Sequence, residues 1–148
     1  MPPLPRHAMT VAEAAVPAWR DALRPYLEAR ALERRRVSYR EVLDALAVPG
    51  PRQIGRLAAA LETTMTEDVA AGRALRAAVV VSQAAPAVPR AGFFAKAREL
   101  GRYAGPDTGP AAEAFHAQEC AALFSEVADA RQNHGREPAG PPEQEGPA

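Results

Sequence analysis

The chain has 148 residues, of which 47% are hydrophobic and 5% aromatic, and its formal net charge is zero. The apolar content is enough for a core, and a single cysteine, Cys120, excludes an internal disulfide and a cysteine-based zinc site. No apolar run approaches the ~18 residues of a membrane span and no signal-peptide core opens the chain, so we expect a cytoplasmic protein.

The charges are unevenly distributed along the chain. Residues 20–56 carry nine arginines against five acidic residues, whereas residues 107–148 carry eight acidic residues against two arginines. The basic N-terminal part favours a polyanionic partner. The acidic C-terminal part could cover that basic surface by charge attraction. The length predicts one domain, placed at residues 10–131 between disordered tails at residues 1–9 and 132–148.

The N-terminal part of the domain is predicted to be helical but interrupted. Residues 10–13 form a capping-box pattern that opens a short helix, and Pro17 should interrupt or restart it. Apolar residues keep helical spacing over residues 18–35. Pro25 lies inside this run, and it should kink or split the helix because its ring removes an N–H donor.

The next stretch predicts two helices joined by a tight turn. Ser38 and Glu41 form a capping box at the start of the first helix. Pro49 ends that helix, because the residue before a proline disfavours helical geometry. Pro51 suits the first position of a second helix that runs to about Ala70. This order is typical of a helix-turn-helix unit.

The side chains around this unit indicate contact with double-stranded DNA. Arginine and glutamine reach phosphates and base edges, and they open the second helix. The candidate DNA-binding residues are Arg34, Arg35, Arg36, Tyr39, Arg40, Arg52, Gln53 and Arg56. The alternative is a protein-interaction module, in which these arginines are solvated helix ends and the apolar surfaces form a homodimer or bind another partner.

The second half of the chain is predicted to hold one strand and further helices. Residues 75–82 are rich in β-branched residues and read as a strand, with Val88 as one candidate for a returning strand. Residues 92–101 and 110–131 read as helices. The predicted fold class is therefore mainly α, with a helix-turn-helix or winged-helix-like core, one short β-strand or hairpin, and additional C-terminal helices.

Little in the sequence indicates catalysis or a cofactor. The histidines His7, His116 and His134 lack metal-ligand spacing, and no glycine-rich phosphate loop is present. His116 and Cys120 stand four residues apart on one helix face, but a nucleophile pair also needs an orienting group and a pocket. The sequence shows neither, so we expect a non-enzymatic protein without metal or cofactor.

One part of the chain resembles a known family. The resemblance is carried by Val37-Ser38-Tyr39, Val42, Leu46, Arg52, Ile54-Gly55-Arg56 and Val79-Val80-Val81. These residues resemble the DNA-binding winged-helix domain of O6-alkylguanine-DNA alkyltransferases and alkyltransferase-like proteins. The resemblance implies that Tyr39 helps to rotate a target nucleotide and that Arg52 inserts into the base stack.

The resemblance does not extend to the reaction of that family. The family places Pro-Cys-His-Arg or Pro-Trp-His-Arg before its valine pair, whereas this chain has Arg76-Ala77-Ala78-Val79 there. Without a nucleophile at this position, the resemblance implies DNA binding without alkyl transfer.

Overall fold

The computed structural model describes the backbone of residues 4–135 and the side chains of residues 18–133. Within that range the chain is mainly helical, as predicted. The elements in order are α1 (Leu4–Leu32), β1 (Val37–Ser38), α2 (Tyr39–Leu46), α3 (Gln53–Ala70), the 3-10 helix η1 (Arg76–Val79), β2 (Val80–Val81), α4 (Ala91–Glu99) and α5 (Pro110–Gly135). None of these helices combines the length and the hydropathy needed to cross a bilayer.

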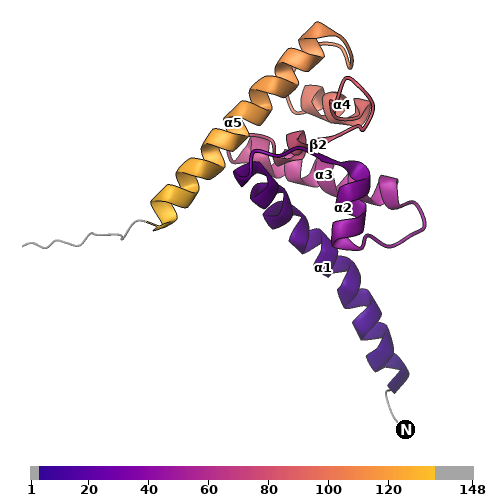
Figure 1. Cartoon of the computed structure of the whole chain (residues 1–148). Coiled ribbons are helices and arrows are strands. Elements are labelled where there is room, and N and C mark those ends of the chain that lie inside the picture. Colours follow the sequence, from indigo (N-terminus) through magenta and orange to yellow (C-terminus); the bar gives the residue numbers. More distant parts are fainter. Residues whose placement is uncertain (1–3, 136–148) are drawn as a thin grey trace, which may run out of the picture.

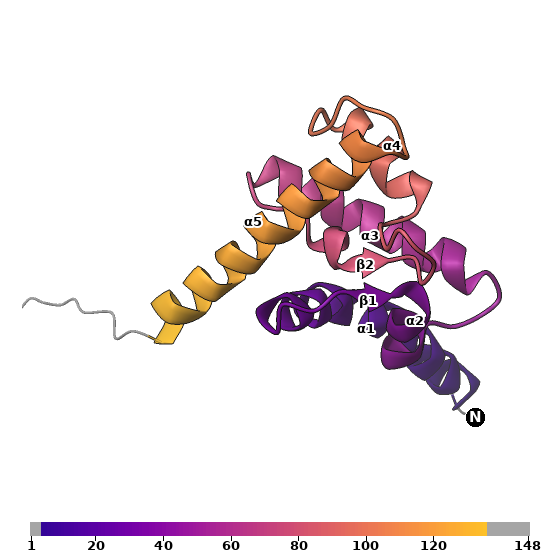
Figure 2. The same cartoon turned by 45° about the horizontal axis from the view of Figure 1, so that its top comes forward.

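The two long helices frame the fold. Figures 1 and 2 show α1 and α5 diverging as two arms, with α2 and α3 alongside α1 and α4 beside the start of α5. The short helix η1 contacts α1, α3 and α5. The core between the arms is built from large apolar side chains of α1, α3, α4, α5 and the segment before η1. These side chains are fully buried and include Leu23, Leu27, Leu57, Met65, Leu75, Phe94 and Leu123. This core fixes the positions of α2 and α3.

Helix α1 is continuous, which corrects the predicted interruptions at Pro17 and Pro25. Pro25 and Asp21 are both exposed, so the carbonyl that loses its donor lies on the solvent side of the helix. Burial of the opposite face, through residues such as Leu23 and Leu27, outweighs the missing hydrogen bond. The helix already begins at Leu4, inside the segment expected as a tail, and residues 1–3 lie outside the described range.

The two-helix unit forms with a longer turn than predicted. Ser38 caps α2, and the reciprocal capping box with Glu41 is present, with hydrogen bonds of 3.0 and 2.8 Å. Helix α3 begins at Gln53 rather than Pro51, because Arg52 takes a left-handed φ of 61° and stands at the N-cap. The Gln53 side-chain amide donates to the Val48 carbonyl oxygen at 2.8 Å and closes the turn.

The predicted strand at residues 75–82 is wrong in its first half. Residues Arg76–Val79 form η1, and only Val80–Val81 form a strand, which pairs in parallel with β1 through Val37↔Val80 and Ser38↔Val81. The physical reason is that β-branched residues, which favour strands, begin only at Val79. The buried segment before Val79 satisfies its backbone hydrogen bonds in a turn, in which the Ala78 N–H donates to the Leu75 carbonyl oxygen. No second strand forms at Val88 among the described residues, although its carbonyl oxygen accepts from the Ser82 N–H at 2.9 Å.

The C-terminal helices lie close to their predicted positions. Helix α4 agrees with the prediction at residues 92–101, and Gly101 follows it with a φ of 80°. Helix α5 starts at Pro110 as predicted but continues past Arg131 to Gly135. Residues 136–148 of the expected C-terminal tail lie outside the described range.

A buried ionic network ties α1, α3 and η1 together. The Asp68 carboxylate is fully buried and accepts from Arg24 Nη1 at 2.6 Å, Arg73 Nε at 3.0 Å and the Arg76 backbone N–H at 3.0 Å. The buried Arg76 guanidinium in turn pairs with Glu28 on α1 and Glu126 on α5. Because buried charges must be paired to be tolerated, these contacts fix how the arms meet the centre.

Candidate nucleic-acid interface

The start of α2 is joined to the loop that precedes α4. The Tyr39 hydroxyl oxygen accepts from the Arg90 backbone N–H at 2.9 Å, and the Arg90 guanidinium carbon lies 5.6 Å from the centroid of the Tyr39 ring. Burial raises the pKa of the Tyr39 hydroxyl, and the contact with Arg90 offsets part of that rise. Tyr39 therefore connects the two-helix unit to the loop at residues 82–90.

An open groove runs along this junction. It has a volume of about 340 Å³ and is lined by Tyr39, Arg40, Ile54, Val81, Ser82, Gln83, Ala84 and Arg90. We call it the Tyr39 groove. One wall comes from α2 and α3 and the other from the loop after β2, so arginine side chains stand on both walls.

The start of α3 has one exposed arginine and two side chains that donate hydrogen bonds to backbone carbonyl oxygens. Arg52 is exposed, and among the described residues no carboxylate lies within ion-pair distance of it. Arg56 Nε donates to the Pro51 carbonyl oxygen at 2.9 Å, which leaves its two terminal nitrogens without a protein acceptor in the described part of the chain. Gln53 is occupied by the Val48 carbonyl oxygen.

Arg34 and Arg36 lie toward α5, apart from the first turn of α3. The guanidinium carbon of Arg34 lies 5.3 Å from the centroid of the Phe124 ring on α5. Arg35 pairs with Glu41 at 3.0 Å and with Glu33 at 3.6 Å. The reason is topological: the turn after α1 leads directly into β1, and α1 ends beside α5 (Figure 1). The structure therefore brings Tyr39 and Arg40 together in the groove and sets Arg34 and Arg36 apart from Arg52.

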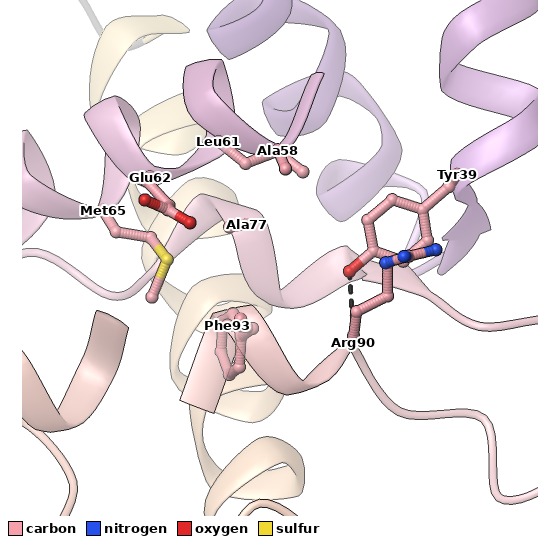
Figure 3. Close-up of a pocket in the computed structure, with 9 residues that line it drawn as sticks. Tyr39, Ala58, Leu61, Glu62, Met65, Ala77, Arg90 and Phe93 are labelled. Carbon is pink, nitrogen blue, oxygen red and sulfur yellow. Dashed lines mark hydrogen bonds between the residues drawn. The ribbon is translucent and has the colours of Figure 1, made fainter. Parts of the chain in front are cut away.

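A second, smaller cavity lies behind the same tyrosine. Its volume is about 60 Å³, and its lining is formed by Tyr39, Ala58, Leu61, Glu62, Met65, Ala77, Arg90, Gly92 and Phe93. We call it the Glu62 pocket. Figure 3 shows the Tyr39 hydroxyl and the Glu62 carboxylate on opposite sides of this space. No local sequence pattern signals this pocket, because its lining comes from α2, α3, η1 and α4, which are separate elements of the chain.

His116 and Cys120 do meet, as their spacing predicted. Cys120 Sγ lies 3.3 Å from His116 Nε2, and that nitrogen lies 2.8 Å from the Ala78 carbonyl oxygen. A carbonyl oxygen only accepts, so Nε2 carries the proton and is not available as a base for the thiol. Burial lowers the pKa of His116 and raises the pKa of Cys120, although Arg36 offsets part of the latter rise. Both shifts disfavour a thiolate–imidazolium pair.

Metal ligation has no support within residues 18–133, where no three histidine, cysteine or acidic side chains gather. Arg90 is not among the residues that the sequence indicates for DNA binding. Its contact with Tyr39 spans 51 positions, and no local pattern signals a pairing of that range.

No protein-family model, curated protein or solved structure matches this chain. The resemblance to the alkyltransferase winged-helix domain therefore remains an interpretation of the residues themselves.

Proposed function

We propose that this protein binds double-stranded DNA without catalysing a reaction, using a winged-helix-like arrangement of α2, α3 and the loop at residues 82–90. The observation that carries the proposal is the Tyr39 groove, whose two walls present Arg40 and Arg90. A DNA backbone in this groove meets cations on both sides. Phosphate contacts of this kind supply most of the affinity of a non-specific complex.

The charges near the groove are suited to exchange with phosphate. Arg52 and Arg90 are exposed and have no carboxylate partner among the residues described. Arg40 pairs with Asp44 at 3.7 Å, but both side chains are more than half exposed, at 58% and 69%. An exposed pair of this length contributes little stability, so a phosphate replaces Asp44 at low cost.

The remaining candidate residues take narrower roles in this proposal. Arg56 keeps its two terminal nitrogens for a phosphate, while its Nε holds the turn. Gln53 positions the turn through Val48 and does not read a base. Arg34 and Arg36 contact flanking phosphates only if the duplex extends along β1 toward α5. Tyr39 stands at the inner end of the groove, where the family resemblance implies a role beside a nucleotide.

A salt-dependent gel shift on random duplex DNA tests the proposal. Each phosphate contact steepens the slope of log K against log salt by about 0.9. The double variants R52A/R56A and R52A/R90A should each lower that slope by about 1.8 and abolish retention near physiological salt. Arg131→Ala, an exposed arginine on α5, is the matched control and should leave the slope unchanged. A slope in both double variants equal to that of the unmodified protein would refute the assigned face.

A protein-interaction module is the second candidate, and one observation favours it. Arg35 and Arg40 already have carboxylate partners in Glu33, Glu41 and Asp44, which lowers the net positive charge around α2. In that case duplex DNA is not retained even at low salt, and the same two double variants leave partner binding intact. The gel shift therefore separates the two functions.

A further inference from the structure

We propose that the Glu62 pocket binds a small organic cation with an apolar body of about one ring. This inference goes beyond DNA binding and does not depend on it. The pocket combines apolar walls with one carboxylate at its edge, and it is separate from the Tyr39 groove except for the shared Tyr39 and Arg90.

The size of the pocket limits the ligand. A cavity needs roughly 10–15 Å³ to hold a single water molecule. The volume of the pocket, about 60 Å³, is several times this minimum, so it admits a compact group such as one ring or a branched aliphatic group. Larger ligands have to project through its mouth beside the exposed Gly92 and Arg90.

The walls favour an apolar body. Leu61, Met65, Ala77 and Phe93 are each at least 94% buried, and the aromatic ring of Tyr39 closes one side. Side chains so well packed reorganise little when a ligand enters, which keeps the cost of binding low. Removal of apolar ligand surface from water then favours occupancy.

The carboxylate sets the charge of the ligand. Glu62 is half-buried, and among the described residues its carboxylate has no cationic partner. In Figure 3 the carboxylate faces the pocket, whereas the Arg90 guanidinium lies over the Tyr39 ring and extends away from Glu62. A cationic group in the pocket therefore has Glu62 as its ionic partner.

Gly92 keeps the mouth of the pocket open. A Cβ atom at this position would lie 3.8 Å from Glu62 Oε2, so even a methyl group would touch the carboxylate. A larger side chain fills the entrance. Gly92 stands in the first turn of α4 with an ordinary backbone conformation, so the substitution is compatible with the helix.

The test uses the full chain and three probes of similar size: benzylamine, benzyl alcohol and benzoate. Met65 is the only methionine among residues 18–133, whose side chains the structure describes, and it lines the pocket, so its ¹³C-methyl NMR signal reports occupancy directly. A Met65→Leu variant assigns the signal. Benzylamine should shift it with millimolar affinity, as expected for a ligand of this size, at least about tenfold more tightly than benzyl alcohol. Benzoate should leave it unchanged.

Variants locate the interaction. Glu62→Gln should reduce the affinity for benzylamine to that of benzyl alcohol, and Gly92→Leu should remove binding of both. Asp129→Asn on α5 is the charge-matched control and should behave like the unmodified protein. A Met65 signal that benzylamine does not move, equal affinity for amine and alcohol, or an unchanged affinity in Glu62→Gln would each overturn the proposal.

Discussion

Replacement of Asp68 by alanine tests the ionic network that joins α1, α3 and η1. The change removes a fully buried carboxylate and leaves the buried Arg76 backbone N–H without its acceptor, which costs about 1–3 kcal/mol. Arg24 and Arg73 are 23% and 38% exposed, so each lost ion pair adds at most about 1 kcal/mol. The sum predicts a loss of about 1–5 kcal/mol, whereas an ordinary surface substitution costs within about 0.5 kcal/mol.

Urea unfolding followed by circular dichroism measures this loss as a lower midpoint with an unchanged m-value. The matched control is Glu67→Ala, which removes the other partner of Arg24 from a side chain that is 55% exposed. That change should cost less than about 1 kcal/mol. If Asp68→Ala costs no more than Glu67→Ala, the carboxylate does not hold the elements together and the reasoning fails.

Three further outcomes follow from the same structure. Ser38→Ala should cost about 1 kcal/mol in urea unfolding, because the α2 capping bond to Glu41 N is lost; a neutral result would contradict the cap. Burial lowers the pKa of His116 in the folded state, so its contribution to stability should be lost as pH falls below about 6.5. His116→Gln, which keeps a donor for Ala78, should weaken that pH dependence; an identical dependence would assign it elsewhere. Cys120 is 1% exposed with a raised pKa, so a thiol reagent at pH 8 should label it only after unfolding. Rapid labelling of the folded protein would reopen a catalytic interpretation.

Local signals predicted the elements whose causes are local. The capping box of Ser38 and Glu41 placed α2. The spacing of His116 and Cys120 correctly predicted their contact. In each case the interacting residues stand within one or two helical turns of each other.

Long-range packing decided the features that the sequence did not reveal. Pro25 is tolerated in α1 because the opposite face of the helix is buried against other elements. The ion pairs that hold η1 in place join Arg76 to Glu28 and Glu126 across 48 and 50 positions, and no local pattern signals them. The Tyr39 groove and the Glu62 pocket likewise depend on the contact between Tyr39 and Arg90, which no periodicity encodes.

The parallel pairing of β1 with β2 determines whether the two-helix unit can fold on its own. Val37 and Ser38 find their backbone partners only at Val80 and Val81, after the chain has passed through α2, α3 and η1. Closing so long a loop is entropically costly and is compensated only when the helices between have docked. The two-helix unit is thus not an independently folding segment. Expressed alone, it would leave β1 without its partner strand, so its folding depends on that of the whole domain.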